Sequence, residues 1–182
     1  MLLQQHIFLT GFMGSGKSTH GKRLAKFLNC RFVDLDHEIT RRVQLSIPEI
    51  FERHGEAYFR EQESLTLKAL LAELTVPAVI SLGGGTVCYY DNLQVAKENG
   101  LLIYLETNEH ALRRRLVDSR NQRPLLKGKS EEEVLDFIKN KIKEREVFYR
   151  QAHLIVNGLN LTTPVLWQKI EAYFHTLNSS NS

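Results

Sequence analysis

The sequence predicts an α/β fold, a single domain in which a central five-stranded parallel sheet is flanked by helices and carries a mobile loop. Three observations predict it. Short apolar runs of strand length recur along the 182 residues, longer segments with helical spacing separate them, and a glycine-rich loop follows the first run. Strands that alternate with helices are typical of a parallel sheet covered on both faces.

The strands and several helix starts can be placed. The apolar runs expected as strands are residues 7–9, 32–33, 79–82, 101–105 and 154–156. Ser46 with Glu49, and Ser130 with Glu133, form the S-x-x-E capping box, which satisfies free amide groups at the start of a helix. A third start is expected at residues 163–164, where a proline can occupy the first helical position.

The longest predicted helix covers residues 56–74. Its apolar side chains recur at helical spacing, so Phe59, Leu65, Ala69 and Leu70 are expected to share one buried stripe. A stripe of this kind would pack the helix against the sheet.

One internal segment and the C-terminus lack this regularity. Residues 118–129 are polar and rich in arginine and lysine, include Pro124 and Gly128, and show neither helical nor strand periodicity, which predicts a mobile loop. Residues 178–182 are small and polar and are expected to be disordered. The predicted domain is therefore residues 1–177, with this mobile loop at about 118–129.

Composition narrows the class of protein. With 42% hydrophobic and 25% charged residues and a net charge of +3, the chain resembles an ordinary folded domain and gives no support for nucleic-acid binding. Cys30 and Cys88 lack the spacing of a zinc or redox motif. The apolar run at 7–9 is too short for a signal peptide or membrane span. We expect a cytoplasmic monomer that acts on small molecules.

The strongest chemical signal is residues 11–18, a full match to G-x-x-x-x-G-K-[ST] between the first strand and a helix. The glycines let backbone amides turn toward phosphate groups, Lys17 can neutralise the β- and γ-phosphates, and Ser18 can ligate Mg²⁺. The motif predicts ATP or GTP binding but not the reaction. The predicted ATP-binding residues of this loop are Gly14, Ser15, Gly16, Lys17, Ser18 and Thr19.

Two carboxylates follow the second strand. In an extended segment, alternation places Asp34 and Asp36 on one side, at the edge of the sheet where ligands of α/β proteins bind. One carboxylate could hold Mg²⁺ through water while the other accepts a proton from an acceptor hydroxyl. The alternative is that the pair only caps a helix over residues 37–43.

Five motifs in this order and spacing resemble the shikimate kinases, P-loop kinases of small metabolites, and the resemblance covers roughly positions 6–165. The motifs are residues 11–19, Asp34 with Asp36, Gly55-Glu56-x-x-Phe59-Arg60-x-x-Glu63, Ser81-Leu82-Gly83-Gly84-Gly85 and Arg123-Pro124-Leu125-Leu126.

The resemblance implies transfer of the γ-phosphoryl group of ATP to the 3-hydroxyl of shikimate, in aromatic amino-acid biosynthesis. It implies that Asp34 and Ser18 hold Mg²⁺ and that Asp36 contacts the shikimate hydroxyls and acts as the base. It also implies that the loop at about 118–129 is a lid that closes over the nucleotide, and that Arg123 is the arginine of the lid that reaches the ATP phosphates. The expected catalytic residues are Lys17, Asp36 and Arg123.

The same resemblance implies a substrate pocket. Arg60 and Arg145 match the arginines that grip the substrate carboxylate, and guanidinium groups suit that task because they bind carboxylates through two hydrogen bonds. Without the resemblance, Arg60 could equally form a surface ion pair with Glu56 or Glu63. The implied substrate-binding residues are Asp36, Arg60, Gly83, Gly84, Gly85 and Arg145.

Two departures from the family pattern and two other functions need testing. Val147 stands where the family commonly has proline after the second arginine, and Asn157 with Gly158 replaces a segment that borders adenine in relatives, so the adenine contacts stay open. Arg115 is a candidate nucleotide contact. The alternatives are a gluconate or nucleoside monophosphate kinase, and a nucleotide-gated binding domain that no longer turns over substrate.

Overall fold

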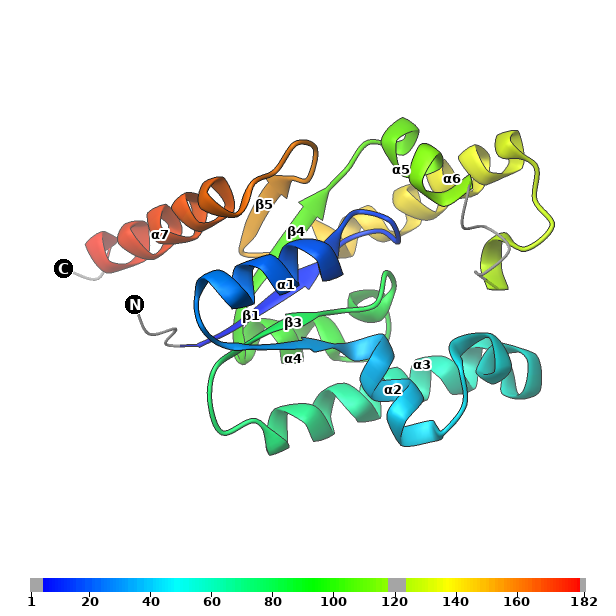
Figure 1. The fold of residues 1–182 in the computed structure, drawn as a ribbon, viewed down its shortest axis with the longest axis horizontal. Helices are drawn as coiled ribbons and strands as arrows, with labels where there is room; N and C mark the ends of the chain where they lie inside the picture. Colours follow the sequence, from blue (N-terminus) through cyan, green and yellow to red (C-terminus); the bar gives the residue numbers. More distant parts are fainter. Residues whose placement is uncertain (1–4, 118–123, 181–182) are drawn as a thin grey trace.

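The computed structural model describes residues 5–117 and 124–180, shown from N- to C-terminus in Figure 1. Five parallel strands form one sheet in the order β2-β3-β1-β4-β5. Each predicted run is a strand, so the expected five-stranded parallel α/β fold is confirmed. The strands are β1 (His6–Thr10), β2 (Arg31–Asp34), β3 (Ala78–Ser81), β4 (Gly100–Glu106) and β5 (Leu154–Asn157).

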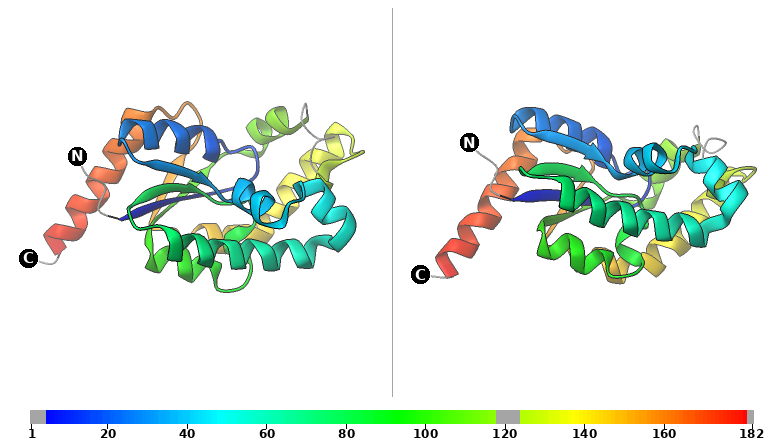
Figure 2. Two further views of the ribbon diagram at one scale, coloured as in Figure 1. Left: turned by 60° about the horizontal axis from the view of Figure 1, so that its bottom comes forward. Right: turned by 90° about the horizontal axis from the view of Figure 1, so that it is seen from below.

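Helices cover both faces of the sheet, as the views in Figure 2 show. The α-helices are α1 (Lys17–Phe27), α2 (Leu35–Val43), α3 (Ile47–Glu73), α4 (Asn92–Glu98), α5 (Glu109–Val117), α6 (Glu131–Tyr149) and α7 (Thr163–Ser180). Short 3₁₀ turns are η1 (Thr86–Cys88) and η3 (Pro124–Leu126). Within the described part of the chain, no helix is both long and apolar enough to span a membrane.

Alternating side chains of the strands form two cores. Phe8 of β1 packs with residues of α2, α3, α4 and α6, whereas its neighbours Ile7 and Leu9 pack with residues of α1 and α7. Successive side chains of a strand point to opposite faces, so a strand buried on both faces must be apolar throughout. That requirement explains why the central strands read as continuous apolar runs.

The long helix α3 differs from its prediction in two ways. It begins at Ile47, and Gly55 interrupts it with a φ of 80°, a left-handed conformation that glycine adopts without strain. The expected stripe is also wrong at Leu65, whose side chain is 54% exposed. The buried face of α3 instead includes the polar residues Arg60 and Glu63. An apolar pattern could not find this face, because Arg60 and Glu63 line a cavity.

Both predicted capping boxes are present, at Ser46 with Glu49 and at Ser130 with Glu133. The C-terminal prediction was wrong in part, because α7 continues to Ser180 and includes residues 178–180. Hydrogen bonds within the helix include the small polar residues of this segment: the Ser179 hydroxyl donates to the His175 carbonyl.

The structure describes only part of the predicted lid. Residues 118–123, including Arg123, lie outside the described residues. The described remainder begins with η3, and Leu126 is buried in a third apolar cluster between α5 and α6. That cluster also contains Phe12 of the glycine-rich loop, so the end of the predicted lid packs beside this loop.

Candidate active site

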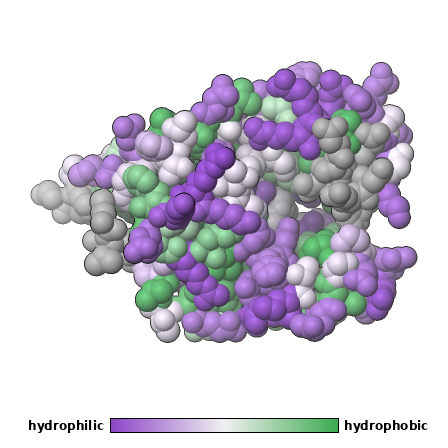
Figure 3. All heavy atoms as spheres, viewed as in Figure 1, coloured by the Kyte–Doolittle hydropathy of each residue, from purple (hydrophilic) through white to green (hydrophobic). Residues whose placement is uncertain are grey.

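Two adjoining cavities open beside the carboxyl ends of the strands. The larger has a volume of about 670 Å³ and is lined by the glycine-rich loop and the first turn of α1. The smaller, of about 230 Å³, lies between α3, α6 and the glycine turn after β3. Met13, Asp36, Gly83 and Gly84 line both cavities. Figure 3 shows the surface hollowed toward the right of the view, with both hydrophilic and hydrophobic residues at its border.

The glycine-rich loop has the backbone that its sequence predicts. Gly14 and Gly16 have φ values of 80° and 97°, and α1 begins directly after Gly16. Lys17 is buried, and its Nζ donates to the carbonyls of Gly11 at 2.8 Å and Phe12 at 3.1 Å. The ammonium group therefore lies over the loop, at the positive end of a helix where anions bind.

Five of the six predicted ATP-binding residues of the loop line the larger cavity. Ser15 is the exception, because it is fully buried and its amide donates to the Phe12 carbonyl at 3.1 Å. The bond closes the turn that shapes the loop. The residues that reach the cavity are Gly14, Gly16, Lys17, Ser18 and Thr19.

Ser18 and Asp34 bring two oxygen atoms together at the wall of the larger cavity. The Ser18 hydroxyl donates to Asp34 Oδ2 at 2.6 Å and lies 3.3 Å from the Ser81 hydroxyl. Among the described residues, no group of three or more His, Cys, Asp or Glu could form a metal cage. Mg²⁺ prefers oxygen ligands and is usually held by one or two carboxylates together with substrate phosphates. This hydroxyl and carboxylate therefore fit Mg²⁺.

Asp34 and Asp36 do not alternate along a strand, as the sequence suggested. β2 ends at Asp34, whose Oδ1 accepts the Asp36 amide at 3.2 Å and caps α2, so Asp36 lies in the first helical turn. The capping alternative is thus correct for Asp34, while both carboxylates still line the larger cavity. The two carboxylates reach one cavity because Asp34 ends β2 and Asp36 lies in the first turn of α2, and not because they alternate along a strand.

The carboxyl of Asp36 faces the junction of the two cavities. Its side chain is exposed to solvent within the cleft that the two cavities form. Desolvation, followed by the charges of Glu63 and Asp34, raises the pKa of Asp36 to about 6, although Lys17 and Arg60 act in the opposite direction. A carboxyl with a raised pKa accepts a proton more readily than an ordinary aspartate.

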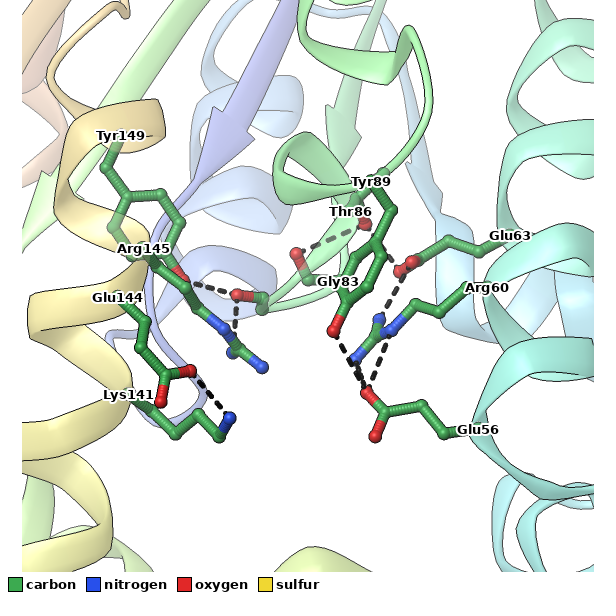
Figure 4. Close-up of polar contacts among 11 residues, drawn as sticks. Glu56, Arg60, Glu63, Gly83, Thr86, Tyr89, Lys141, Glu144, Arg145 and Tyr149 are labelled. Carbon is green, nitrogen blue, oxygen red and sulfur yellow. Dashed lines mark hydrogen bonds and ion pairs between the residues drawn. The ribbon is translucent and has the colours of Figure 1, made fainter.

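Arg60 points from α3 into the smaller cavity and is buried (Figure 4). Its Nη1 donates to Glu63 at 2.8 Å, and its Nη2 and Nε donate to one oxygen of Glu56 at 3.0 and 3.2 Å. Burial acts to lower the pKa of Arg60, but the interactions with Glu63 and Glu56 outweigh it and raise the pKa. Arg60 therefore forms both of the ion pairs, with Glu56 and Glu63, that the sequence offered as an alternative to substrate binding. The arginine is nevertheless buried and lines a cavity, so these are not ion pairs of an exposed surface residue.

Arg145 reaches the same cavity from α6, and Figure 4 shows the two guanidinium groups on opposite sides of the space beneath the glycine turn. Its Nη1 donates to the Gly84 carbonyl at 3.0 Å, and the Tyr149 hydroxyl donates to the same carbonyl. Val147 is 64% exposed, so the residue at the position of the missing family proline lies away from Arg145.

The glycine turn is crowded by the polar groups around it. A Cβ atom at Gly83 would collide with Glu63 and Thr86, and at Gly85 it would lie 3.0 Å from the Arg60 guanidinium. At Gly84 it would lie 3.0 Å from the Met13 amide nitrogen. Only glycine lets the backbone approach both arginines and the phosphate-binding loop this closely.

Other residues at the site were missed or left open by the sequence. Arg115 lines the larger cavity and donates to the Gly14 carbonyl at 2.9 Å, and Gly158 and Asn160 line the same cavity after β5. Tyr89 and Tyr149 were not assigned any role. No local pattern marks them, because each contacts the site through residues distant in the sequence.

Comparison with known proteins decides the family. The sequence model described as shikimate kinase matches residues 13–175. This chain belongs to the shikimate kinase family. A shikimate kinase of Bacteroides thetaiotaomicron is 43% identical over 152 residues, which cover 84% of this chain and 86% of the relative.

Solved structures agree with the family. The crystal structure of the shikimate kinase from Bacteroides thetaiotaomicron has a TM-score of 0.80 and 39% identity, covering 96% of this chain and 97% of that one. Shikimate kinase from Acinetobacter baumannii in complex with shikimate has a TM-score of 0.80 and 35% identity, covering 98% and 94%. A gluconokinase from Sinorhizobium meliloti, with 16% identity and a TM-score of 0.56, shares the fold alone.

Proposed function

We propose that this protein transfers the γ-phosphoryl group of ATP to the 3-hydroxyl of shikimate, giving shikimate 3-phosphate and ADP, a step of the chorismate pathway to aromatic amino acids. The observation that carries the proposal is the pair of buried arginines, Arg60 and Arg145, in a cavity that adjoins the phosphate-binding loop. An acid bound by the arginines would present its hydroxyls to Asp36, which borders both cavities.

The smaller cavity suits a compact, rigid carboxylic acid. Guanidinium groups recognise carboxylates by paired, charge-assisted hydrogen bonds, and burial strengthens such bonds by excluding water. Gly83 and Gly84 bring the backbone close to the ligand space without side chains that would obstruct it. The apolar side chains of Ile47, Phe51 and Leu125 complete the lining, which suits the ring of such an acid.

The reacting groups meet at the junction of the cavities. Asp36 accepts the proton of the acceptor hydroxyl as its oxygen attacks the γ-phosphorus, and Lys17 stabilises negative charge on the phosphate oxygens. Most of the acceleration comes from holding the two substrates in line and from preorganised charge.

Ser18 and Asp34 would hold Mg²⁺ in this proposal. The bound ion would supply positive charge that offsets the negative charge of the ATP phosphates. The lid over residues 118–129 of the 1–177 domain, and with it the contact of Arg123 with the ATP phosphates, stays a prediction, because residues 118–123 lie outside the described part of the chain. The cytoplasmic location and the monomeric state stay predictions.

The first experiment measures ADP release by the purified protein with Mg²⁺-ATP, with and without shikimate, and identifies the product by mass. We expect ADP release that depends on shikimate and a product heavier by one phosphoryl group. Turnover with gluconate or a nucleoside monophosphate, but not with shikimate, would overturn the proposal. Binding of ATP and shikimate without any product would support a nucleotide-gated binding domain instead.

A further inference from the structure

We infer that Tyr89 is a positioning residue for substrate binding, which holds the Arg60 guanidinium from outside the smaller cavity. This inference rests on the proposed function, because it assigns Tyr89 to the binding of the substrate carboxylate by Arg60. Arg60 lines the smaller cavity, whereas Tyr89 and Glu56 are not among its described lining residues. Figure 4 shows the Tyr89 ring alongside the Arg60 side chain, with its hydroxyl directed toward Glu56.

Tyr89, Glu56 and Arg60 form a closed arrangement. The Arg60 Cζ lies 4.5 Å from the centre of the Tyr89 ring, within the range of a cation–π interaction. The Tyr89 hydroxyl donates to Glu56 Oε1 at 3.3 Å, and the same oxygen accepts both Arg60 Nη2 and Nε. Tyr89 thus contacts the guanidinium with its ring and also holds the carboxylate that fixes its outer edge.

The arginine needs such support because its long side chain loses conformational freedom when it is fixed for binding. The Glu56 side chain is 42% exposed, and an ion pair with an exposed partner contributes little by itself. The Tyr89 ring packs against the guanidinium of Arg60, whose side chain is only 7% exposed. With the ring in place, Arg60 is held before the substrate arrives, which lowers the entropy lost on binding.

The test compares Tyr89→Leu and Tyr89→Phe with the matched control Tyr90→Leu. Tyr90 is the next residue and its side chain is 66% exposed. Loss of the cation–π contact in Tyr89→Leu is expected to raise KM for shikimate about 3- to 10-fold, while kcat and KM for ATP change less than about twofold. Tyr89→Phe keeps the ring and loses only a long hydrogen bond, so it should restore most of the affinity. The control should match the unaltered protein.

A double-mutant cycle with Arg60→Lys separates positioning from a general effect on the fold. If Tyr89 acts through the guanidinium, Tyr89→Leu should raise KM for shikimate much less in the Arg60→Lys protein than in the unaltered one. An equal rise in both backgrounds would overturn the inference. So would equal rises in KM for shikimate and for ATP, or no change in Tyr89→Leu.

A second measurement does not depend on shikimate. The NMR signal of the Arg60 Nε–H, assigned by its loss in Arg60→Lys, should exchange with water faster in Tyr89→Leu than in the unaltered protein or in Tyr90→Leu. Absence of turnover with shikimate would defeat the proposed function but leave this signal to decide whether Tyr89 holds Arg60. Unchanged exchange in Tyr89→Leu would overturn the inference even in an active enzyme.

Discussion

The hydroxyl of Ser18 donates a 2.6 Å hydrogen bond to the carboxylate of Asp34, which joins the first turn of α1 to the end of β2. The two residues belong to separate motifs, and only the pairing of β2 with β3, and of β3 with β1, brings the motifs to the same edge of the sheet. Asp34 has a second task, because its other oxygen caps α2. A substitution at Asp34 must therefore preserve the cap if it is to report on Mg²⁺ alone.

Asp34→Asn meets that condition, because asparagine caps helices as well as aspartate does. We expect the Mg²⁺ concentration that gives half of the maximal rate to rise about 10- to 100-fold, while the melting temperature changes little. Titration of activity with Mg²⁺ measures the effect. Asp91→Asn, at an exposed aspartate that pairs with Lys68, is the control and should leave the titration unchanged. An unchanged Mg²⁺ requirement in Asp34→Asn would remove Asp34 from the metal site.

Asp36→Asn replaces the proposed base with a group of nearly the same shape that cannot accept the proton. Because general base catalysis contributes about 10²- to 10⁴-fold, kcat should fall by that order. Shikimate binding, measured by calorimetry, should change far less, since the amide can still contact hydroxyl groups. Turnover at the unaltered rate would show that another group takes the proton.

Arg145→Lys keeps the positive charge but removes the planar guanidinium group and its paired N–H donors. Hydrogen bonds to charged groups contribute about 1.5–3 kcal/mol, so KM for shikimate should rise about 10- to 100-fold. KM for ATP should stay near its original value. Arg150→Lys is the control at the end of the same helix, where Arg150 pairs with Glu106 and Glu146 at the surface. Equal effects of the two substitutions would mean that Arg145 supports the helix and not the substrate.

Ser130→Ala removes the side-chain cap of α6, the helix that carries Arg145. Loss of a serine cap costs about 1 kcal/mol, so the free energy of unfolding should fall by that amount with an unchanged dependence on urea. Ser130→Asp, which restores a good capping side chain, should recover most of the loss. A fully stable Ser130→Ala protein would show that the cap seen between Ser130 and Glu133 contributes little.

Features that depend only on residues close together in the sequence could be predicted from it. The strand runs, the capping boxes at Ser46 and Ser130, and the turn around Gly14 and Gly16 follow from local sterics and local hydrogen bonds. The resemblance to shikimate kinases named Arg60 and Arg145, and both line one cavity, while their role in binding stays a prediction. Their approach to the same cavity could not be derived from spacing, because it requires α3 and α6 to pack on the same face of the sheet.

The sequence by itself thus determined the α/β class, the phosphate-binding loop and the starts of the capped helices. Tertiary structure decided the rest. The buried face of α3 contains Arg60 and Glu63 and not Leu65, which the sequence had predicted to be buried. Asp36 lies in the first turn of α2 and not in a strand. Tyr89 lies beside Arg60. The physical reason is that local patterns record the preferences of adjacent residues. The face that a helix buries, and the partners that neutralise a buried charge, depend on elements far apart in the chain.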